Sequence, residues 1–314
     1  MHIRVRTPSR IHITLIDLNG SIGRVDGGVG LTLHEPFIEL RAREGDEIVV
    51  RGSAVNLDRF RTAAERMAKM CGTGIEIEVL SDYESHVGLG SGTQISLAVG
   101  RAFSELYGLE LTTRQIAEIM GRGGTSGIGV AAFDLGGLIV DGGHSRGEKQ
   151  DFLPSSASKA KPAPVIARHD FPDWDIVVAI PELKGFYGRK EVNLFQQVCP
   201  VPLEDVRELC HIILMKLLPA VVEADLDEFG RAIKRIQELG FKKAEVDQYG
   251  DLIRGSFEIA ECIGMSSTGP AVYAITDSNA RKIAAEIENY FGDRGLSCRL
   301  YITKARNRGV EVEV

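Results

Sequence analysis

The most informative segment of this chain is a glycine-rich stretch that reads Gly88-Leu89-Gly90-Ser91-Gly92-Thr93. It follows the strand-like alternation of residues 74–80 and precedes helically spaced apolar residues that begin at Ile95. Glycines let the backbone turn tightly and bring its N–H groups close to a ligand, and the following helix offers its positive N-terminus. This combination favours a bound phosphate. Taken alone, a strand-to-helix turn without a ligand explains the glycines equally well.

A second loop strengthens the case for a ligand. The stretch is neither a Walker A sequence nor a Rossmann fingerprint, so its identity depends on the surrounding sequence. Residues 264–270 form another polar loop with glycines, which contains Ser267 and Thr268 and directly precedes a predicted strand. We expect the two loops to face each other across a cleft between two domains.

The first half of the chain is predicted to mix strands with a few helices. The apolar spacing from Leu57 to Cys71 predicts a helix that Gly72 ends, and a further helix should open at Thr112 with a capping box to Gln115. Strands are predicted at residues 2–7, 10–16, 36–43, 47–51 and 74–80.

The second half has a different rhythm, which indicates an α+β layer of the split-βαβ type. Its predicted order is a strand at 174–180, helices at 203–218, 225–239 and 252–262, a strand at 270–276, a helix at 278–291, and strands at 297–303 and 309–314. Residues 150–164 show little periodicity. We therefore predict an N-terminal domain over 1–162 and a C-terminal domain over 163–314.

Composition excludes several classes of protein. The formal net charge of −7 argues against a general nucleic-acid footprint, so an anionic small molecule must be met by a local group of Arg and Lys. The five cysteines are scattered, which argues against a disulfide framework and a zinc cluster. The sequence has neither an apolar run long enough to span a membrane nor a signal core at its start, so we expect a cytoplasmic protein.

The motifs of this sequence resemble those of the GHMP kinase superfamily. The superfamily pattern Pro-x-x-x-Gly-Leu-Gly-Ser-Ser-Ala reads here from Glu84 to Thr93, with Glu84 in place of Pro and with Gly92 and Thr93 in place of Ser and Ala. Residues 8–12 resemble its first motif, and residues 265–270 resemble its third. The resemblance implies a two-domain fold with an N-terminal ribosomal-S5-like α/β domain and a C-terminal ferredoxin-like domain.

One departure from that pattern bears on function. In many of these kinases a Ser-Gly-x-Asp segment carries an Asp that deprotonates the substrate hydroxyl, whereas the matching segment here ends in Gly129. Loss of this base weakens the interpretation as an ATP-dependent kinase, which stays open because some members lack the Asp. A non-catalytic sensor of a phosphorylated ligand is the third alternative.

A branch of the superfamily resembles this chain more closely: the beta-ribofuranosylaminobenzene 5'-phosphate synthases of methanopterin biosynthesis. The similarity lies in the segments 10–20, 23–30, 86–94, 121–129 and 141–144. It implies that phosphoribosyl pyrophosphate condenses with 4-hydroxybenzoate or 4-aminobenzoate, with release of pyrophosphate and carbon dioxide. It also implies Mg²⁺ as cofactor, with the loop Gly88–Thr93 holding the phosphates. Many members of the superfamily are dimers, so we expect a homodimer by analogy.

That chemistry suggests roles for residues beside the matching segments. The catalytic candidates are His12, His144 and Arg122; the substrate-binding candidates are Arg10, Arg24, Lys184, Arg189, Ser267 and Thr268; and the metal candidates are Asp17, Asp26 and Asp141. Arginine suits a carboxylate because its planar fork binds two oxygens. Solvated charges, structural histidines and Asp-containing turns remain alternatives for individual members of this set.

Overall fold

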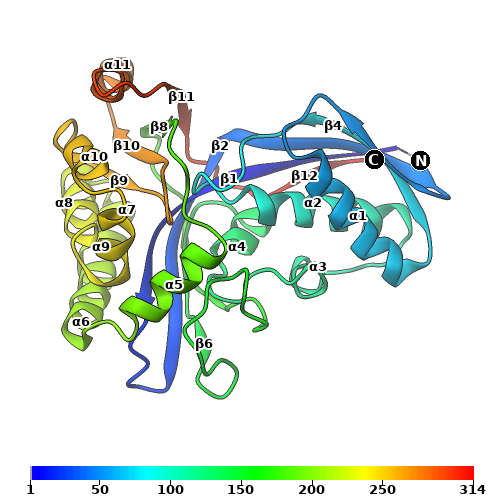
Figure 1. The fold of residues 1–314 in the computed structure, drawn as a ribbon, viewed down its shortest axis with the longest axis horizontal. Helices are drawn as coiled ribbons and strands as arrows, with labels where there is room; N and C mark the ends of the chain where they lie inside the picture. The colour runs from blue at the N-terminus through cyan, green and yellow to red at the C-terminus, as the bar shows by residue number, and fades with distance from the viewer. Residues whose placement is uncertain (1) are drawn as a thin grey trace.

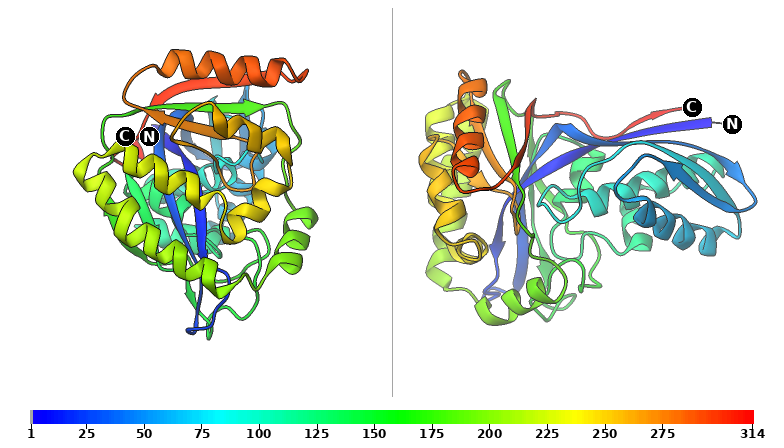
Figure 2. Two further views of the ribbon diagram at one scale, coloured as in Figure 1. Left: turned by 90° about the vertical axis from the view of Figure 1, so that its left-hand side faces the viewer. Right: turned by 45° about the horizontal axis from the view of Figure 1, so that its top comes forward.

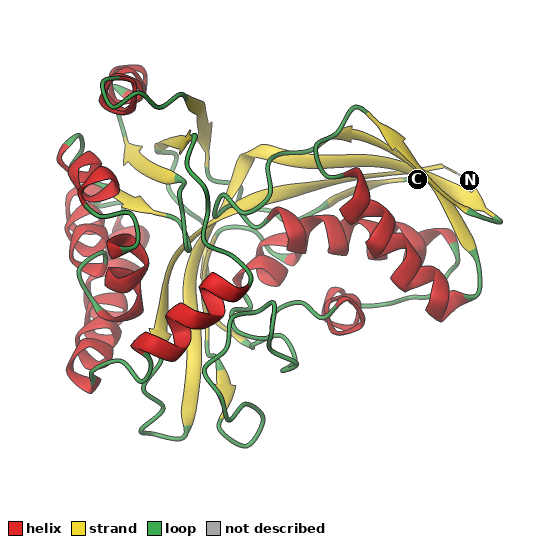
Figure 3. Cartoon of the chain, in the orientation of Figure 1, coloured by secondary structure: helices red, strands yellow, loops and turns green. Residues whose placement is uncertain are grey.

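The computed structural model describes residues 2–314, which form two β-sheets with helices packed on both (Figure 1, Figure 3). The strands are β1 (His2–Asp17), β2 (Arg24–Gly45), β3 (Ile48–Gly52), β4 (Gly74–Ser81), β5 (Leu138–Asp141), β6 (His144–Ser145), β7 (Val165–His169), β8 (Asp175–Pro181), β9 (Ile263–Met265), β10 (Val272–Thr276), β11 (Cys298–Lys304) and β12 (Glu311–Glu313). The helices are α1 (Leu57–Cys71), α2 (Ser91–Leu106), α3 (Thr113–Met120), α4 (Ile128–Asp134), α5 (Arg189–Val198), α6 (Leu203–Ile212), η1 (Ile213–Leu217), α7 (Leu218–Glu223), α8 (Leu226–Ile236), α9 (Gly240–Asp247), α10 (Asp251–Arg254), η2 (Gly255–Glu258) and α11 (Ala280–Gly292).

The first sheet is built on a long antiparallel hairpin of β1 and β2. Its strand order is β12-β1-β2-β4-β3, and β5 also pairs with β2 and carries β7. Register shifts after Thr7 and after His12 bend the hairpin, so that it contacts α2 at one end and α9 at the other (Figure 1). The two strands predicted at 2–7 and 10–16 are therefore one bent strand.

The second sheet has the strand order β11-β8-β10-β9, with every neighbouring pair antiparallel. This is the order of a split βαβ unit, so the predicted ferredoxin-like layer is confirmed. Helix α11 packs on β8 and β11, and the helices from α6 to α10 form an outer layer (Figure 2).

Local sequence signals account for some of the helix ends. Gly72 ends α1 in the left-handed conformation, and Thr112 and Gln115 form the predicted capping box. The helix predicted at 203–218 is present but contains the π-helical turn η1, and the one predicted at 252–262 is shorter and ends in the 3-10 turn η2. Helices α5 and α9 were not predicted, because neither begins with a side-chain cap that a sequence pattern reveals.

The two sheets do not divide the chain at residue 162. Strand β7 still belongs to the first sheet, and β12 returns to pair with β1, which places the two ends of the chain side by side (Figure 2). The change from one sheet to the other therefore lies between β7 and β8. In the described part of the chain no helix is both long and apolar enough to cross a membrane.

Candidate active site

The two glycine-containing loops meet, as predicted. The Ser266 hydroxyl donates a hydrogen bond to the Gly88 carbonyl at 2.7 Å, and the Ala271 N–H donates to the Val87 carbonyl at 3.0 Å. The Ser267 N–H also donates to the His12 carbonyl of β1 at 2.8 Å. These bonds join the second sheet to the first and form the floor of a cleft.

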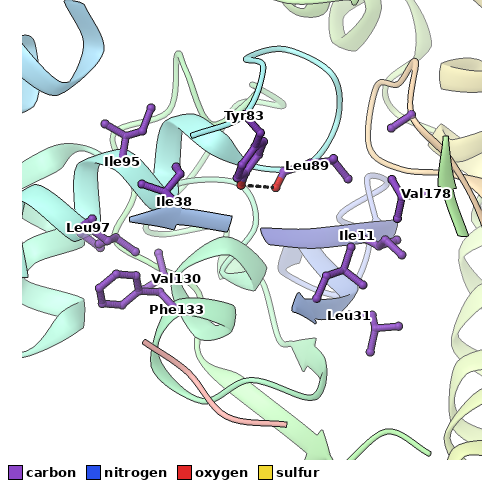
Figure 4. Packing of buried hydrophobic residues seen from close by; sticks show 14 of the residues in the cluster. Ile11, Leu31, Ile38, Tyr83, Leu89, Ile95, Leu97, Val130, Phe133 and Val178 are labelled. Carbon is purple, nitrogen blue, oxygen red and sulfur yellow. Dashed lines mark hydrogen bonds between the residues drawn. The ribbon is translucent and has the colours of Figure 1, made fainter. Parts of the chain in front are cut away.

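The backbone of the first loop needs its glycines. Gly88 and Gly90 have φ values of 94° and 82°, and a Cβ on Gly88 would lie 2.3 Å from the Ser266 carbonyl oxygen. Leu89 points the other way, into the core, where its carbonyl accepts a hydrogen bond from the Tyr83 hydroxyl at 3.1 Å (Figure 4). Leu89 therefore anchors the loop and does not line the cleft, in contrast to its predicted place among the phosphate-binding residues.

The first part of the cleft, which we call the arginine lobe, encloses about 190 Å³. It is lined by Arg10, Arg59, His86, Gly88, Gly90, Ser91, Gly92, Thr93, Arg122, Ser156, Phe186, Tyr187, Gly188, Glu191, Ser267 and Thr268. Helix α2 begins here, so its positive end faces the same space. The sequence prediction placed most of these residues together, although their binding of phosphate stays a prediction.

The electrostatics of the arginine lobe favour a polyanion. Burial lowers the pKa of Arg10 to about 10, and its Nη1 donates to the Gly88 carbonyl. Burial, and then the like charges of Arg59 and Arg66, lower the pKa of Arg122. A bound anion with several charges would relieve both the desolvation and the repulsion.

The second part of the cleft, the His12 lobe, encloses about 140 Å³. It is lined by Arg10, His12, Leu15, Thr93, Gly123, Thr125, Ser126, Gly129, Pro154, Ser155, Glu191, Phe195, Glu245 and Ser267. Arg10, Thr93, Glu191 and Ser267 line both lobes. The two lobes are therefore adjacent parts of one cleft.

His12 ends a buried chain of hydrogen bonds, which we call the relay and which runs through Ser126 to Asp141. Its Nε2 lies 3.0 Å from Ser126 Oγ, which lies 3.2 Å from Asp141 Oδ2. If Ser126 donates to the Asp141 carboxylate, Nε2 must donate to Ser126, which leaves Nδ1 with a free lone pair. That Nδ1 is buried and has no hydrogen-bond partner among residues 2–314. Burial, Arg10 and Lys242 hold the pKa of His12 well below its usual value, so the ring is neutral.

Two carboxylates from different helices border the His12 lobe. Glu245 of α9 forms an ion pair with the buried Lys242 at 2.5 Å, and Lys242 also donates to the Ser267 carbonyl at 2.8 Å. Glu191 of α5 faces Glu245 and Arg10, and burial followed by Glu245 raises its pKa to about 7. Glu191 thus lies where a cation would stabilise its ionised form.

Gly129, which takes the place of the kinase Asp, also lines the His12 lobe. A Cβ on Gly129 would lie 3.2 Å from the Thr93 Cγ2 methyl carbon. Two of the departures from the GHMP kinase pattern, Thr93 and Gly129, are therefore in contact. The threonine methyl group lies against the space that a larger residue at 129 would enter.

His144 and Asp26 lie in a separate buried network, and both differ from their predicted roles. Asp26 accepts from His144 Nδ1 at 2.6 Å and from Lys149 Nζ at 2.9 Å, and His144 Nε2 lies 2.8 Å from the Lys161 carbonyl oxygen. Burial opposes protonation of His144, but its hydrogen bonds to Asp26 and to Lys161 outweigh it and raise its pKa. Lys149 and Lys161 flank the loop that carries Ser155 and Ser156, so the network fixes both ends of that loop beside the cleft.

The remaining predicted residues lie outside the two lobes or have structural partners. Asp17 Oδ1 accepts from the N–H groups of Asn19 and Gly20, and Arg24 donates to the carbonyls of Gly142 and Gly143. Both Asp141 oxygens accept backbone N–H groups, so Asp141 orients the relay and is not free to hold a metal. Lys184 lines a different hollow, and Arg189 is exposed at the start of α5. Residues 2–314 contain no cluster of three or more potential metal ligands.

Sequence reasoning missed several residues that line the cleft. Arg59 lies on α1 and Glu191 on α5, both far from the glycine motifs in sequence. Ser126 lies in the segment that ends in Gly129, where the sequence pattern suggests no role for it. Because helical charged residues are usually solvated, only the fold shows that Arg59 and Glu191 face inward.

Comparisons with known proteins agree with this architecture. The model for the GHMP kinases N terminal domain matches residues 58–137, and the model for GHMP kinases C terminal matches residues 217–293. A relative from Archaeoglobus fulgidus, named Beta-ribofuranosylphenol 5'-phosphate synthase, is 74% identical over 99% of this chain and 100% of its own length. This chain belongs to the beta-ribofuranosylphenol 5'-phosphate synthase family. The synthase family is an enzyme family, so the chain is a transferase, as predicted, and the non-catalytic sensor is excluded.

Further relatives define the family and the fold separately. A Methanocaldococcus jannaschii protein of the same name is 45% identical over 98% of this chain and 99% of its own length. The crystal structure of homoserine kinase from Cytophaga hutchinsonii superimposes with a TM-score of 0.67 at 16% identity, covering 99% of this chain and 97% of its own. That similarity shows the GHMP kinase fold, which the synthase family shares.

Replacement of Gly90 tests the loop. Gly90→Ala should sharply weaken binding of inorganic pyrophosphate, because a Cβ there would lie 3.2 Å from the Arg10 guanidinium at a φ of 82°. Gly108→Ala is the matched control, since Gly108 also has positive φ but open space around its Cβ. Calorimetric titration measures the affinity and circular dichroism the fold. Equal pyrophosphate affinity in the two variants would remove the loop from the site.

Removal of Lys149 tests the buried network. Lys149→Met should lower the free energy of unfolding by about 3–5 kcal/mol, because Asp26 loses the cation that compensates its buried charge. The double variant Asp26→Leu/Lys149→Met should recover much of this loss, since it buries no unpaired charge. Urea unfolding monitored by fluorescence measures both. A single variant as stable as the parent would show that the network is not stabilising.

Proposed function

We propose that this transferase condenses phosphoribosyl pyrophosphate with a para-substituted benzoate and releases pyrophosphate and carbon dioxide. The observation that carries the proposal is the pair of adjacent lobes. One is lined by three arginines and the start of α2, and the other combines apolar Leu15 and Phe195 with polar His12. The first suits the phosphates of a sugar diphosphate, and the second suits a small aromatic acid.

The relatives favour one of the two benzoates. Their printed name, Beta-ribofuranosylphenol 5'-phosphate synthase, describes a phenol product. A phenol with a ribosyl group on carbon arises from 4-hydroxybenzoate, whereas 4-aminobenzoate would yield an aminobenzene. We therefore assign 4-hydroxybenzoate as the acceptor of this chain.

Departure of the diphosphate is the step that the arginine lobe would assist. The bond between the ribose C1 and the diphosphate oxygen breaks, its electron pair stays on the oxygen, and positive charge grows on the sugar ring. Backbone N–H groups at the start of α2, together with Arg10, Arg59 and Arg122, would stabilise the negative charge on the leaving group. Walls formed by both domains would shield the sugar cation from water.

The residues that would hold Mg²⁺ differ from those predicted. Asp26 is paired with Lys149 and His144, and Asp17 and Asp141 accept backbone N–H groups, so these three do not fit the ion. Glu191 does fit, because it is the one carboxylate among the described residues that line the arginine lobe. Mg²⁺ in such sites uses one or two carboxylates together with phosphate oxygens and would neutralise diphosphate charge.

Attack by the aromatic ring follows at the sugar C1. The ring carbon that bears the carboxylate forms the new carbon–carbon bond, and the phenolic hydroxyl becomes strongly acidic as positive charge enters the ring. The free Nδ1 lone pair of His12 would accept this proton even though burial makes His12 a weak base. Carbon dioxide then leaves, its bonding pair restores aromaticity, and the proton returns to the phenolate oxygen.

The kinase alternative receives less support from the site. Gly129 offers no carboxylate to deprotonate an alcohol, and Thr93 packs against the position that such a side chain would occupy. A homodimer stays a proposal by analogy with the superfamily.

A direct assay tests the function. Purified protein with Mg²⁺, phosphoribosyl pyrophosphate and carboxyl-labelled 4-hydroxybenzoate should release labelled carbon dioxide and pyrophosphate in equal amounts. The same mixture with ATP in place of phosphoribosyl pyrophosphate is the control and should release neither. ATP consumption with a small alcohol, together with no carbon dioxide release from either benzoate, would establish the kinase instead.

The relay predicts a pH dependence. Burial raises the pKa of Asp141 to about 7, and protonation of Asp141 weakens the charge-assisted hydrogen bond from Ser126 that fixes the His12 tautomer. We expect kcat to rise with pH through about 7 and to lose this inflection in Ser126→Ala, with a drop of about 10- to 100-fold. Ser104→Ala is the control, because Ser104 is a buried serine outside the cleft whose hydroxyl accepts a hydrogen bond from the Leu111 N–H. An unchanged inflection in Ser126→Ala would rule the relay out.

A further inference from the structure

Two arginines from different parts of the chain converge on one glycine. Arg59 lies on α1 and Arg122 follows α3, and a Cβ on Gly92 would lie 2.9 Å from Arg59 Nη1 and 3.7 Å from Arg122 Nη1. Both guanidinium groups therefore reach the first turn of α2. A side chain at position 92 would enter the space that Arg59 occupies.

The convergent pair lacks a counter-charge. Burial, Arg59 and Arg66 all lower the pKa of Arg122, whereas among residues 2–314 the only ionisable neighbour that raises the pKa of Arg59 is Tyr187. Glu191 lines the same lobe, but its charged neighbours are Glu245 and Arg10. Two half-buried cations held side by side without a carboxylate repel each other, and a bound polyanion reverses that repulsion.

Other contacts hold the pair in place without an anion. Arg122 Nε donates to Ser96 Oγ at 3.1 Å, which leaves its two terminal nitrogens directed toward Gly92. Arg59 contacts His86 Nε2, and the His86 ring stacks on Tyr187 with centroids 3.8 Å apart. Each guanidinium is thus oriented by one nitrogen and keeps others free, as two-point recognition of phosphate oxygens requires.

From this geometry we infer that Arg59 and Arg122 form a diphosphate clamp, which recognises the leaving group of the sugar substrate. The inference rests on the proposed function for the identity of the sugar, but the clamp itself requires only a diphosphate. A single carboxylate is the less suitable ligand, because two guanidinium groups, Arg10 and the α2 N-terminus supply more positive charge than it balances. Arg122 therefore binds with the phosphates and not with the benzoate, in contrast to its sequence-predicted catalytic role.

The clamp also explains a departure from the superfamily pattern. The GHMP kinase motif carries Ser where this chain has Gly92. Glycine at this position leaves room for the Arg59 guanidinium at the start of α2. The contact between Arg59 and Gly92 therefore links the choice of a diphosphate ligand to the loss of the serine side chain at position 92.

The experiment measures binding of inorganic pyrophosphate to the full chain by calorimetric titration. Arg59→Gln and Arg122→Gln should each weaken binding about 10- to 100-fold, the range that loss of a charge-assisted hydrogen bond produces. Affinity for 4-hydroxybenzoate should stay unchanged in both. Arg231→Gln, which removes an exposed arginine of α8, is the control for net charge.

A second variant separates the clamp from folding. Gly92→Ala should not lower the melting temperature, because alanine favours a helix more than glycine does, yet it should weaken pyrophosphate binding about tenfold by displacing Arg59. Pyrophosphate affinity within twofold of the parent in both arginine variants would overturn the clamp, as would a selective loss of 4-hydroxybenzoate binding. If the arginine variants bind pyrophosphate more weakly but the parent protein releases no carbon dioxide in the assay, only the proposed reaction would be overturned.

Discussion

The hydrogen bond from the Ser266 hydroxyl to the Gly88 carbonyl is the contact on which the rest of the site depends. It joins the loop before α2 to the loop before β10, and the Ala271 N–H strengthens the same seam. Without this seam the arginine lobe would have only one wall, because Ser267 and Thr268 lie in the loop between β9 and β10 of the second sheet, whereas the glycine loop follows β4 of the first. Gly88 is required there because a side chain would collide with the Ser266 carbonyl.

The cleft divides its charges between its two lobes in a way that suits a reaction between two different molecules. Arginines gather around Gly90 and Gly92, whereas the neutral His12 and the paired Lys242 and Glu245 border the second lobe. Arg10 lines both lobes, so in the proposed reaction it would contact both the leaving group and the acceptor. The proposed substitution at a sugar carbon suits this separation of a strongly cationic region from a smaller mixed one. Negative charge would develop on the leaving diphosphate, whereas positive charge would enter the attacking ring.

Several polar residues that look catalytic in the sequence instead stabilise the fold around the cleft. Asp26, His144 and Lys149 form a buried network that holds the loop of Ser155 and Ser156, and Asp141 is fixed by the N–H groups of Gly127 and Gly143. Glycines beside these residues allow the close backbone approach that the network requires. In this chain, these residues beside the glycine motifs therefore support the site and do not line the arginine lobe.

Residue order was enough to predict the superfamily fold, the glycine loop, the contact of that loop with residues 264–270, and the family. These follow from local spacing and from motifs whose residues are contiguous, so the chain order already contains them. The folded chain was needed to show that Arg59, Glu191 and Ser126 face the cleft and that Arg122 lies beside Gly92. It also shows that Asp26 and His144 do not line the cleft. The direction in which a helical or loop side chain points depends on how α1, α5 and the bent β1–β2 hairpin pack against one another. That packing brings together residues far apart in sequence, and no local pattern encodes it.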